Sequence, residues 1–82
     1  MATMAMIGKT ANYTVYFQKQ KDGNRRFYFE HEKYGDADGQ VAIVGPDDTV
    51  VDLDMCGVLG KEPADYLRTM GVDTDGAAVD DN

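Results

Sequence analysis

Cysteine, histidine and tryptophan are nearly absent from this 82-residue sequence, which has one, one and none of them. Cys56 has no second cysteine for an internal disulfide or a cysteine-based zinc site, and the lone His31 excludes most metal and acid–base constellations. The sequence has no apolar run of about 18 residues, which excludes a membrane-spanning helix. The first twelve residues lack the basic region and long apolar core of a secretory signal. We therefore expect a cytoplasmic protein that does not contact membranes.

Basic residues are also few, with eight against fifteen acidic residues, and the net charge is -7. They are unevenly placed, because residues 1–28 hold five cations and one carboxylate, whereas residues 29–82 hold three cations and fourteen carboxylates. Such asymmetry suggests a charged partner surface. The competing interpretation is that net charge keeps a small protein soluble and that Asp fills its loops.

One acidic stretch has the composition of a calcium loop but not its spacing. Alignment of Gly39 with the invariant glycine places Tyr34 at the first ligand position and Gly45 where a bidentate Glu is required. We reject an EF-hand, and a weak surface calcium site at Asp36 and Asp38 is the less favoured interpretation.

Motifs for catalysis are missing as well. Gly60-Lys61 is not a phosphate-binding loop, because the earlier glycine is absent and Glu62 stands where Ser or Thr would bind magnesium. Cys56 and His31 could form a nucleophile and base, but a single cysteine beside a core strand is more often a small buried hydrophobe. We expect no enzyme activity, cofactor or metal.

Two segments rich in aromatic and β-branched residues, 13–19 and 25–31, predict a β-hairpin with a turn at 21–23. A two-residue loop would place Val15 opposite Glu30 and mix apolar with charged partners. A three-residue loop with Gly23 in the left-handed conformation avoids this mixture, so we favour it. It pairs Tyr13 with His31, Val15 with Phe29 and Phe17 with Phe27 on one face, and Thr14 with Glu30, Tyr16 with Tyr28 and Gln18 with Arg26 on the other.

A second hairpin follows a loop predicted at 32–39. Its strands are 40–44 and 49–55, and Pro46 favours a turn over 45–48. Pairing Ile43 with Val51 and Val41 with Leu53 places these apolar residues on one face. Asp52 and Asp54 then lie together on the opposite face, because strand side chains alternate.

One short helix is predicted from Pro63, which suits a first helical position, to Gly71, which suits a left-handed stop. Ala64, Leu67 and Met70 form its apolar stripe. The fold class is therefore α+β: an antiparallel meander of four strands, or five if residues near the N-terminus add an edge strand, with the helix packed on its apolar face. We expect a compact domain over 1–72 and an acidic flexible tail over 73–82.

The core is small and gives only a few kcal/mol of net stability, so docking on a partner or forming a homodimer would add stability. The acidic half offers one docking surface, because Asp52 and Asp54 point the same way about 6.8 Å apart and Asp47 and Asp48 lie at the hairpin tip. Such a strip has the electrostatics of a nucleic-acid backbone. The acidic candidates are Asp36, Asp38, Asp47, Asp48, Asp52 and Asp54.

The first hairpin offers another surface. Tyr16 and Tyr28 lie side by side on one face, with Arg25 and Arg26 nearby. Aromatic residues flanked by cations suit single-stranded nucleic acid, and Tyr with Arg also suits a protein interface. The competing interpretation is that another segment covers these tyrosines.

In its size and its Asp-rich half (Asp47, Asp48, Asp52, Asp54), the chain resembles small acidic phage-encoded inhibitors, including anti-CRISPR proteins and DNA mimics. The resemblance implies that a charged surface occludes a nucleic-acid-handling complex of the host. We therefore predict a protein-binding inhibitor whose partner has a basic surface. The alternative is a small single-stranded nucleic-acid-binding protein that uses the hairpin 13–31.

Overall fold

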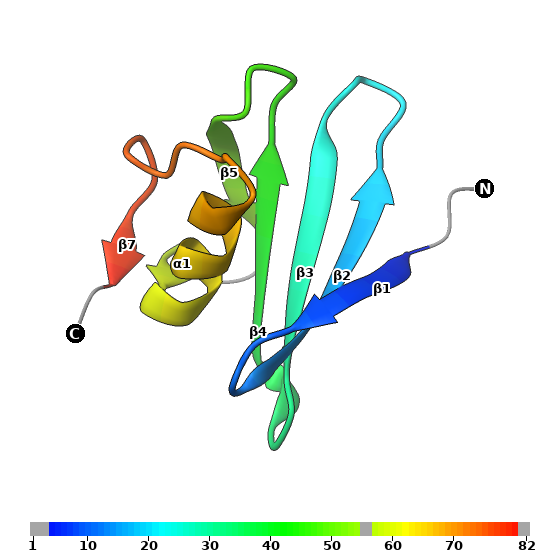
Figure 1. Ribbon diagram of the computed structural model, residues 1–82, viewed down its shortest axis with the longest axis vertical. Helices are drawn as coiled ribbons and strands as arrows, with labels where there is room; N and C mark the ends of the chain where they lie inside the picture. The colour runs from blue at the N-terminus through cyan, green and yellow to red at the C-terminus, as the bar shows by residue number, and fades with distance from the viewer. Residues whose placement is uncertain (1–3, 55–56, 81–82) are drawn as a thin grey trace.

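The computed structural model describes residues 4–54 and 57–80, which form a five-stranded antiparallel sheet and one helix (Figure 1). The sheet strands are neighbours in sequence order, so the sheet is a meander. This arrangement confirms the predicted α+β class in its five-stranded form. The sheet strands are β1 (Ala5–Lys9), β2 (Tyr13–Lys19), β3 (Arg25–His31), β4 (Gly35–Val44) and β5 (Val50–Asp54); they are followed by β6 (Leu59–Gly60), α1 (Lys61–Thr69) and β7 (Val79–Asp80).

The β2–β3 hairpin has the predicted strands and the predicted register, with Phe17 opposite Phe27 and Tyr16 opposite Tyr28. Its loop is closed by hydrogen bonds from Gln20 N–H to the Asn24 carbonyl (2.9 Å) and from Gly23 N–H to the Gln20 carbonyl (3.2 Å). Gly23 has a φ of 90°, a left-handed conformation that costs glycine little. The alternation of side chains therefore determined this hairpin.

β4 begins at Gly35, so the prediction of a loop over 32–39 was wrong for its second half. The turn comprises only residues 32–34, because Gly35 takes a left-handed φ of 56° and pairs with His31. The register then shifts between the pairs His31–Gly35 and Phe29–Gln40, which leaves extra residues on β4. A bulge of this kind keeps a Gly- and Asp-rich segment in the sheet.

The predicted register of the second hairpin was also wrong. Ala42 lies opposite Phe27, so Ala42 and Val44 face the core, and Val41 and Ile43 lie on the other face. On β5, Ala42 pairs with Leu53 and Val44 with Val50, which leaves Val51 as a bulged residue that is 56% exposed. Without this bulge, Asp52 would face the core. The register of β3 and β4 therefore set that of β5.

Helix α1 packs on the apolar face of the sheet, and Figure 1 shows it in front of β5 and beside β4. It begins at Lys61, two residues before the predicted start; Pro63 is tolerated because first-turn N–H groups need no helical partner. It ends as predicted, since Gly71 has a φ of 86° and Val72 N–H donates to the Leu67 carbonyl at 3.0 Å. Met70, predicted to lie on the apolar stripe, follows the last helical residue and is 47% exposed.

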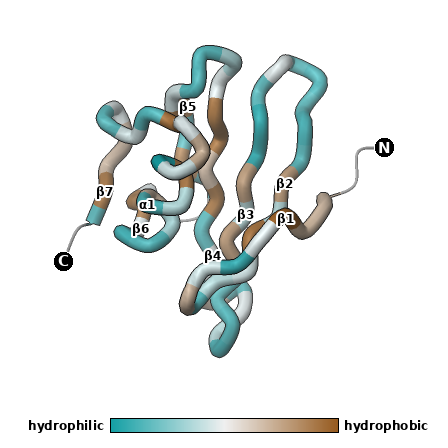
Figure 2. Tube along the Cα trace, in the orientation of Figure 1, coloured by the Kyte–Doolittle hydropathy of each residue, from teal (hydrophilic) through white to brown (hydrophobic). Residues whose placement is uncertain are grey.

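The core lies between α1 and the sheet, and Figure 2 shows the hairpin tips as hydrophilic. Phe27 and Phe29 are fully buried in it, and Tyr66 of α1 packs its ring against Phe29 with 6.0 Å between centroids. The buried core residues are Val15, Phe27, Phe29, Ala42, Val44, Leu59, Ala64, Leu67 and Val72.

Residues 73–80, for which the sequence predicted a loose tail, lie against the domain in the structure. Thr74 is 2% exposed, and its hydroxyl accepts a hydrogen bond from Arg68 Nε at 2.8 Å. Asp73 bridges to Thr49 beside β5, and Val79 of β7 pairs with Leu59 of β6. The small and acidic residues of this segment suggested a loose tail, and composition alone does not reveal these backbone pairings.

Candidate functional site

The sheet face opposite α1 brings together the two surfaces that the sequence placed on separate hairpins. We call it the outer face. The registers align one row of residues across all five strands and a second row across four of them. The first row is Met6, Tyr16, Tyr28, Val41 and Asp54, and the second is Gln18, Arg26, Ile43 and Asp52. The two tyrosines and the two strand aspartates therefore share one surface.

The aromatic part of the outer face is ordered by contacts along β3 and β4. The rings of Tyr16 and Tyr28 are stacked, with 6.0 Å between centroids and 25° between planes. The Tyr28 hydroxyl donates to the Asp36 carboxylate, and its ring lies over Gly39, where a Cβ would meet the ring at 3.1 Å. Both tyrosines are half-buried, and Met6 beside Tyr16 is 60% exposed. This part of the face offers apolar contact area in a fixed arrangement.

The acidic strip predicted from Asp47, Asp48, Asp52 and Asp54 is partly neutralised by arginines. Arg25 donates to the Asp48 carboxylate and to the Gly45 carbonyl (3.0 Å), and Arg26 Nη1 lies 3.1 Å from Asp54 Oδ2. The structure thus uses cations of the first hairpin to hold the second. Sequence spacing could not reveal these pairs because they join residues more than 20 positions apart.

Asp47 and Asp52 differ in their surroundings. The Thr49 hydroxyl, 2.8 Å from Asp47 Oδ1, donates to that carboxylate and lowers its pKa, so Asp47 serves the turn. Asp52 is exposed on β5, and among the described residues its carboxylate has no hydrogen-bond or ionic partner. Of the four carboxylates, Asp52 is therefore the one most available to a partner.

The two remaining acidic candidates lie in the bulged start of β4. Asp36 is bound to Tyr28, and Asp38 is exposed. Within residues 4–54 and 57–80, no group of three or more His, Cys, Asp or Glu side chains is arranged to hold a metal ion. The structure thus ties Asp36 to the aromatic part of the outer face.

His31 has a structural environment at the end of β3. Its Nδ1 accepts hydrogen bonds from the N–H groups of Lys33 (3.1 Å) and Tyr34 (3.3 Å), and its ring packs edge-on against Tyr13. These contacts fix the tight turn into β4. Cys56, the other candidate for nucleophilic chemistry, lies outside the described residues.

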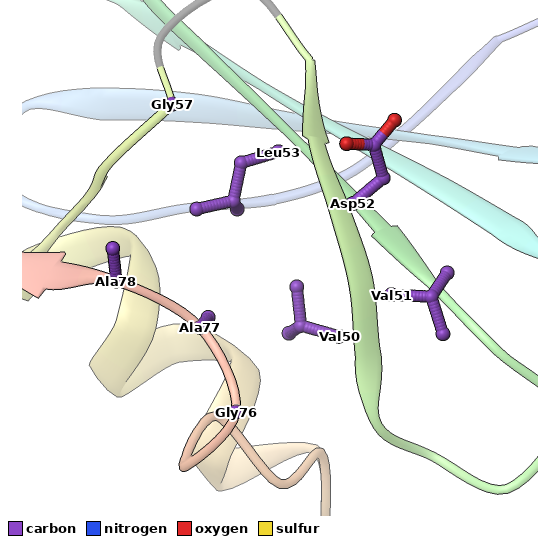
Figure 3. Close-up of a pocket in the computed structure, with 8 residues that line it drawn as sticks. All are labelled: Val50, Val51, Asp52, Leu53, Gly57, Gly76, Ala77 and Ala78. Carbon is purple, nitrogen blue, oxygen red and sulfur yellow. The ribbon is translucent and has the colours of Figure 1, made fainter.

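A hollow of about 240 Å³ lies beside β5, and no sequence pattern predicted it. One wall is residues 50–53 of β5, and the other is Gly57 with residues 76–78 (Figure 3). Val50 and Leu53 point toward Ala77 and Ala78, whereas the Asp52 carboxylate points away (Figure 3). The hollow forms because the chain bridges to β5 at Asp73 and then diverges to pair with β6.

Comparisons with protein-family models, with curated proteins and with solved structures found no match for this chain. In the described part of the chain, no helix has the length and apolar character needed to cross a membrane. Functional inference therefore rests on the geometry of the outer face and of the hollow.

Proposed function

We propose that this chain is a non-enzymatic protein-binding module that docks its outer face on a basic surface of a nucleic-acid-handling complex and so occludes that surface. The supporting observation is that a stacked tyrosine pair and the carboxylates of Asp52 and Asp54 share the face of the sheet opposite α1. Tyrosines supply large contact area at protein interfaces, and carboxylates steer a cationic partner to that area.

The charge profile supports an inhibitor of the phage-encoded anti-CRISPR or DNA-mimic type, acting in the host cytoplasm. The net charge of -7 favours cationic partners over nucleic acid. In such a complex, the outer face would compete with nucleic acid for the same cations of the partner.

Direct binding of single-stranded nucleic acid, the other function that the sequence suggested, has less support from the geometry. The guanidinium groups of Arg25 and Arg26 are engaged with Asp48 and Asp54, which reduces their charge toward phosphates. The rings of Tyr16 and Tyr28 also stack on each other, so each has one face occupied where a base would stack.

The test is capture of partners from host lysate at low and high salt, followed by identification of the bound proteins. We expect a basic nucleic-acid-handling complex that dissociates as salt rises and that added DNA or RNA displaces. Reversal of both outer-face aspartates, Asp52→Lys with Asp54→Lys, is expected to abolish capture while the fold is retained.

Asp75→Lys provides a matched control for the single variant Asp52→Lys. Both aspartates are exposed, and within the described residues neither carboxylate has a partner, so the two changes alter net charge equally. Loss of capture in Asp52→Lys but not in Asp75→Lys would locate the effect on the outer face. Undiminished capture by a folded Asp52→Lys, Asp54→Lys protein would contradict the proposal.

A further inference from the structure

The edge of β5 has main-chain groups that the described chain leaves available. One edge of β5 pairs with β4. At the start of the other edge, Val50 N–H donates to the Asp73 carbonyl (3.3 Å), and Asp73 N–H donates to the carbonyl of Asp48, just before β5 (2.8 Å). Beyond them, no main-chain hydrogen bond joins residues 51–54 to the described residues across the hollow. An unpaired strand edge of this kind is a template for another strand.

The hollow is smaller than the usual site for a small molecule. Its volume of about 240 Å³ is below the roughly 300–1,000 Å³ of small-molecule pockets. Among the described residues, the side chains that line it are aliphatic, or absent at the glycines, apart from Asp52, which points away (Figure 3). The described walls therefore offer mainly main-chain polar groups, those of β5 among them, and an extended peptide satisfies such groups by hydrogen bonding.

The flanking charges determine which peptide fits. A strand added to β5 would extend the two outer-face rows, so its outward side chains would lie beside Asp54 and Asp52, at the spacing of directly opposite residues. The side chain between them would point the other way, into the hollow beside Leu53. Lysine or arginine would complement the two carboxylates, and an aliphatic residue would fill the hollow.

These relationships lead to one proposal, which rests on the proposed function and specifies its partner. We propose that β5 accepts an extended segment of the partner protein with the pattern basic–aliphatic–basic. The segment adds as a sixth strand, its aliphatic side chain enters the hollow, and its two basic side chains pair with Asp52 and Asp54. The same carboxylates oppose pairing of β5 with β5 of a second copy, because like charges directly opposite are destabilising.

The edge strand β1 is a weaker acceptor by the same reasoning. Like β5, it is five residues long and has a register shift, between Met6 and Gly8, but it differs from β5 in having Lys9 at its end, which pairs with Glu32. A lysine on an edge strand discourages strand addition. The acidic residues of β5 instead favour the addition of a positively charged strand.

The experiment uses the whole chain and a capped probe peptide, acetyl-Lys-Val-Lys-Val-Lys-amide. NMR titration is expected to shift the amide signals of residues 51–54 and to slow their hydrogen exchange. A probe N-methylated at both valines keeps the charge but loses main-chain donors, and it is expected to bind at least tenfold more weakly. Equal binding of both probes, or shifts confined to Tyr16 and Tyr28, would overturn strand addition.

A filled hollow provides the second variant. Ala77→Phe places a ring in the hollow, and Ala11→Phe, at an exposed position in the turn between β1 and β2, is its control. We expect Ala77→Phe to abolish the peptide-induced shifts and Ala11→Phe to retain them. Peptide binding by a folded Ala77→Phe protein at the wild-type affinity would overturn the proposal.

Capture of the natural partner separates this proposal from the proposed function. If Ala77→Phe captures the partner like wild type while Asp52→Lys does not, docking by the outer face stands and strand addition fails. If Asp52→Lys and Ala77→Phe both capture it undiminished, both proposals fail. If amide shifts at residues 51–54 appear on concentrating the protein without peptide, the occupant is a second copy and the proposal of a partner segment is overturned.

Discussion

The guanidinium group of Arg26 on β3 reaches across β4 to the carboxylate of Asp54 on β5, with Nη1 and Oδ2 3.1 Å apart. Arg26 lies opposite Ile43 and Asp54 lies opposite Val41, so the ion pair runs diagonally across β4. The pair joins the basic first hairpin to the acidic second hairpin. It also sets how much of the outer face remains negative.

We expect Arg26→Gln to lower stability modestly and to strengthen binding to a basic partner. The side chains of Arg26 and Asp54 are both partly exposed. A double-mutant cycle of Arg26→Gln with Asp54→Asn should therefore give a coupling free energy of about 0.2–1 kcal/mol that falls as salt is added. Denaturant unfolding measures the coupling, and partner capture measures binding. Weaker capture by Arg26→Gln would mean that the guanidinium group itself contacts the partner.

Gly39→Ala should displace Tyr28 from its stacked position. A Cβ at residue 39 would lie 3.1 Å from Tyr28 Cε1, tighter than ordinary packing, so we expect a loss of about 1–2 kcal/mol and a changed near-ultraviolet circular dichroism of the tyrosines. Gly76→Ala is the control, because nothing lies within 4 Å of its added Cβ. Identical spectra for wild type and Gly39→Ala would argue against this contact.

Leu53→Ala should cost more stability than Val51→Ala. Leu53 packs against the core, so Leu53→Ala is expected to lower the free energy of unfolding by about 1–2 kcal/mol. Val51 is 56% exposed, so Val51→Ala should change it by less than about 0.5 kcal/mol. Urea unfolding of the two variants measures the difference. Equal losses would instead support the register in which Val51 and Leu53 face the same side.

Glu62→Gln should weaken the attachment of the β1–β2 turn to α1. Glu62 accepts hydrogen bonds from the Thr10 hydroxyl, from Asn12 N–H (2.7 Å) and from Asn12 Nδ2 (2.8 Å). Burial alone would raise the pKa of Glu62, but these hydrogen bonds outweigh it and place the pKa below the usual 4.5. Hydrogen bonds to a charged group suggest a loss of about 1–2 kcal/mol in the variant.

The pH dependence follows from the lowered pKa of Glu62. Its stabilisation is fully present above the unfolded-state pKa of 4.5 and is lost as pH falls through the lower folded-state pKa. We therefore expect the difference in unfolding free energy between wild type and Glu62→Gln to shrink between pH 6 and about pH 3. A difference that stays constant over this range would show that the ionised carboxylate is not the stabilising form.

The sequence by itself determined the first hairpin, the fold class and the end of α1. Residues 13–19 and 25–31 alternate cleanly, so one register alone gives an apolar face, and Gly23 and Gly71 meet local requirements for left-handed backbone. These features depend on neighbours in the chain. For that reason local pattern was sufficient to predict them, including the pairing of Tyr16 with Tyr28.

The tertiary structure alone decided the register of β5, the Arg25–Asp48 and Arg26–Asp54 pairs, and the hollow. Within the second hairpin, pairing Ile43 with Val51 looked favourable, but Phe27 of β3 fixes Ala42 as the core residue, and the bulge at Val51 follows. The hollow depends on where Asp73 meets β5 and where Val79 meets β6. Such long-range pairings leave no periodic trace in the sequence, so the joining of both candidate surfaces on one face emerged only when the strands were assembled.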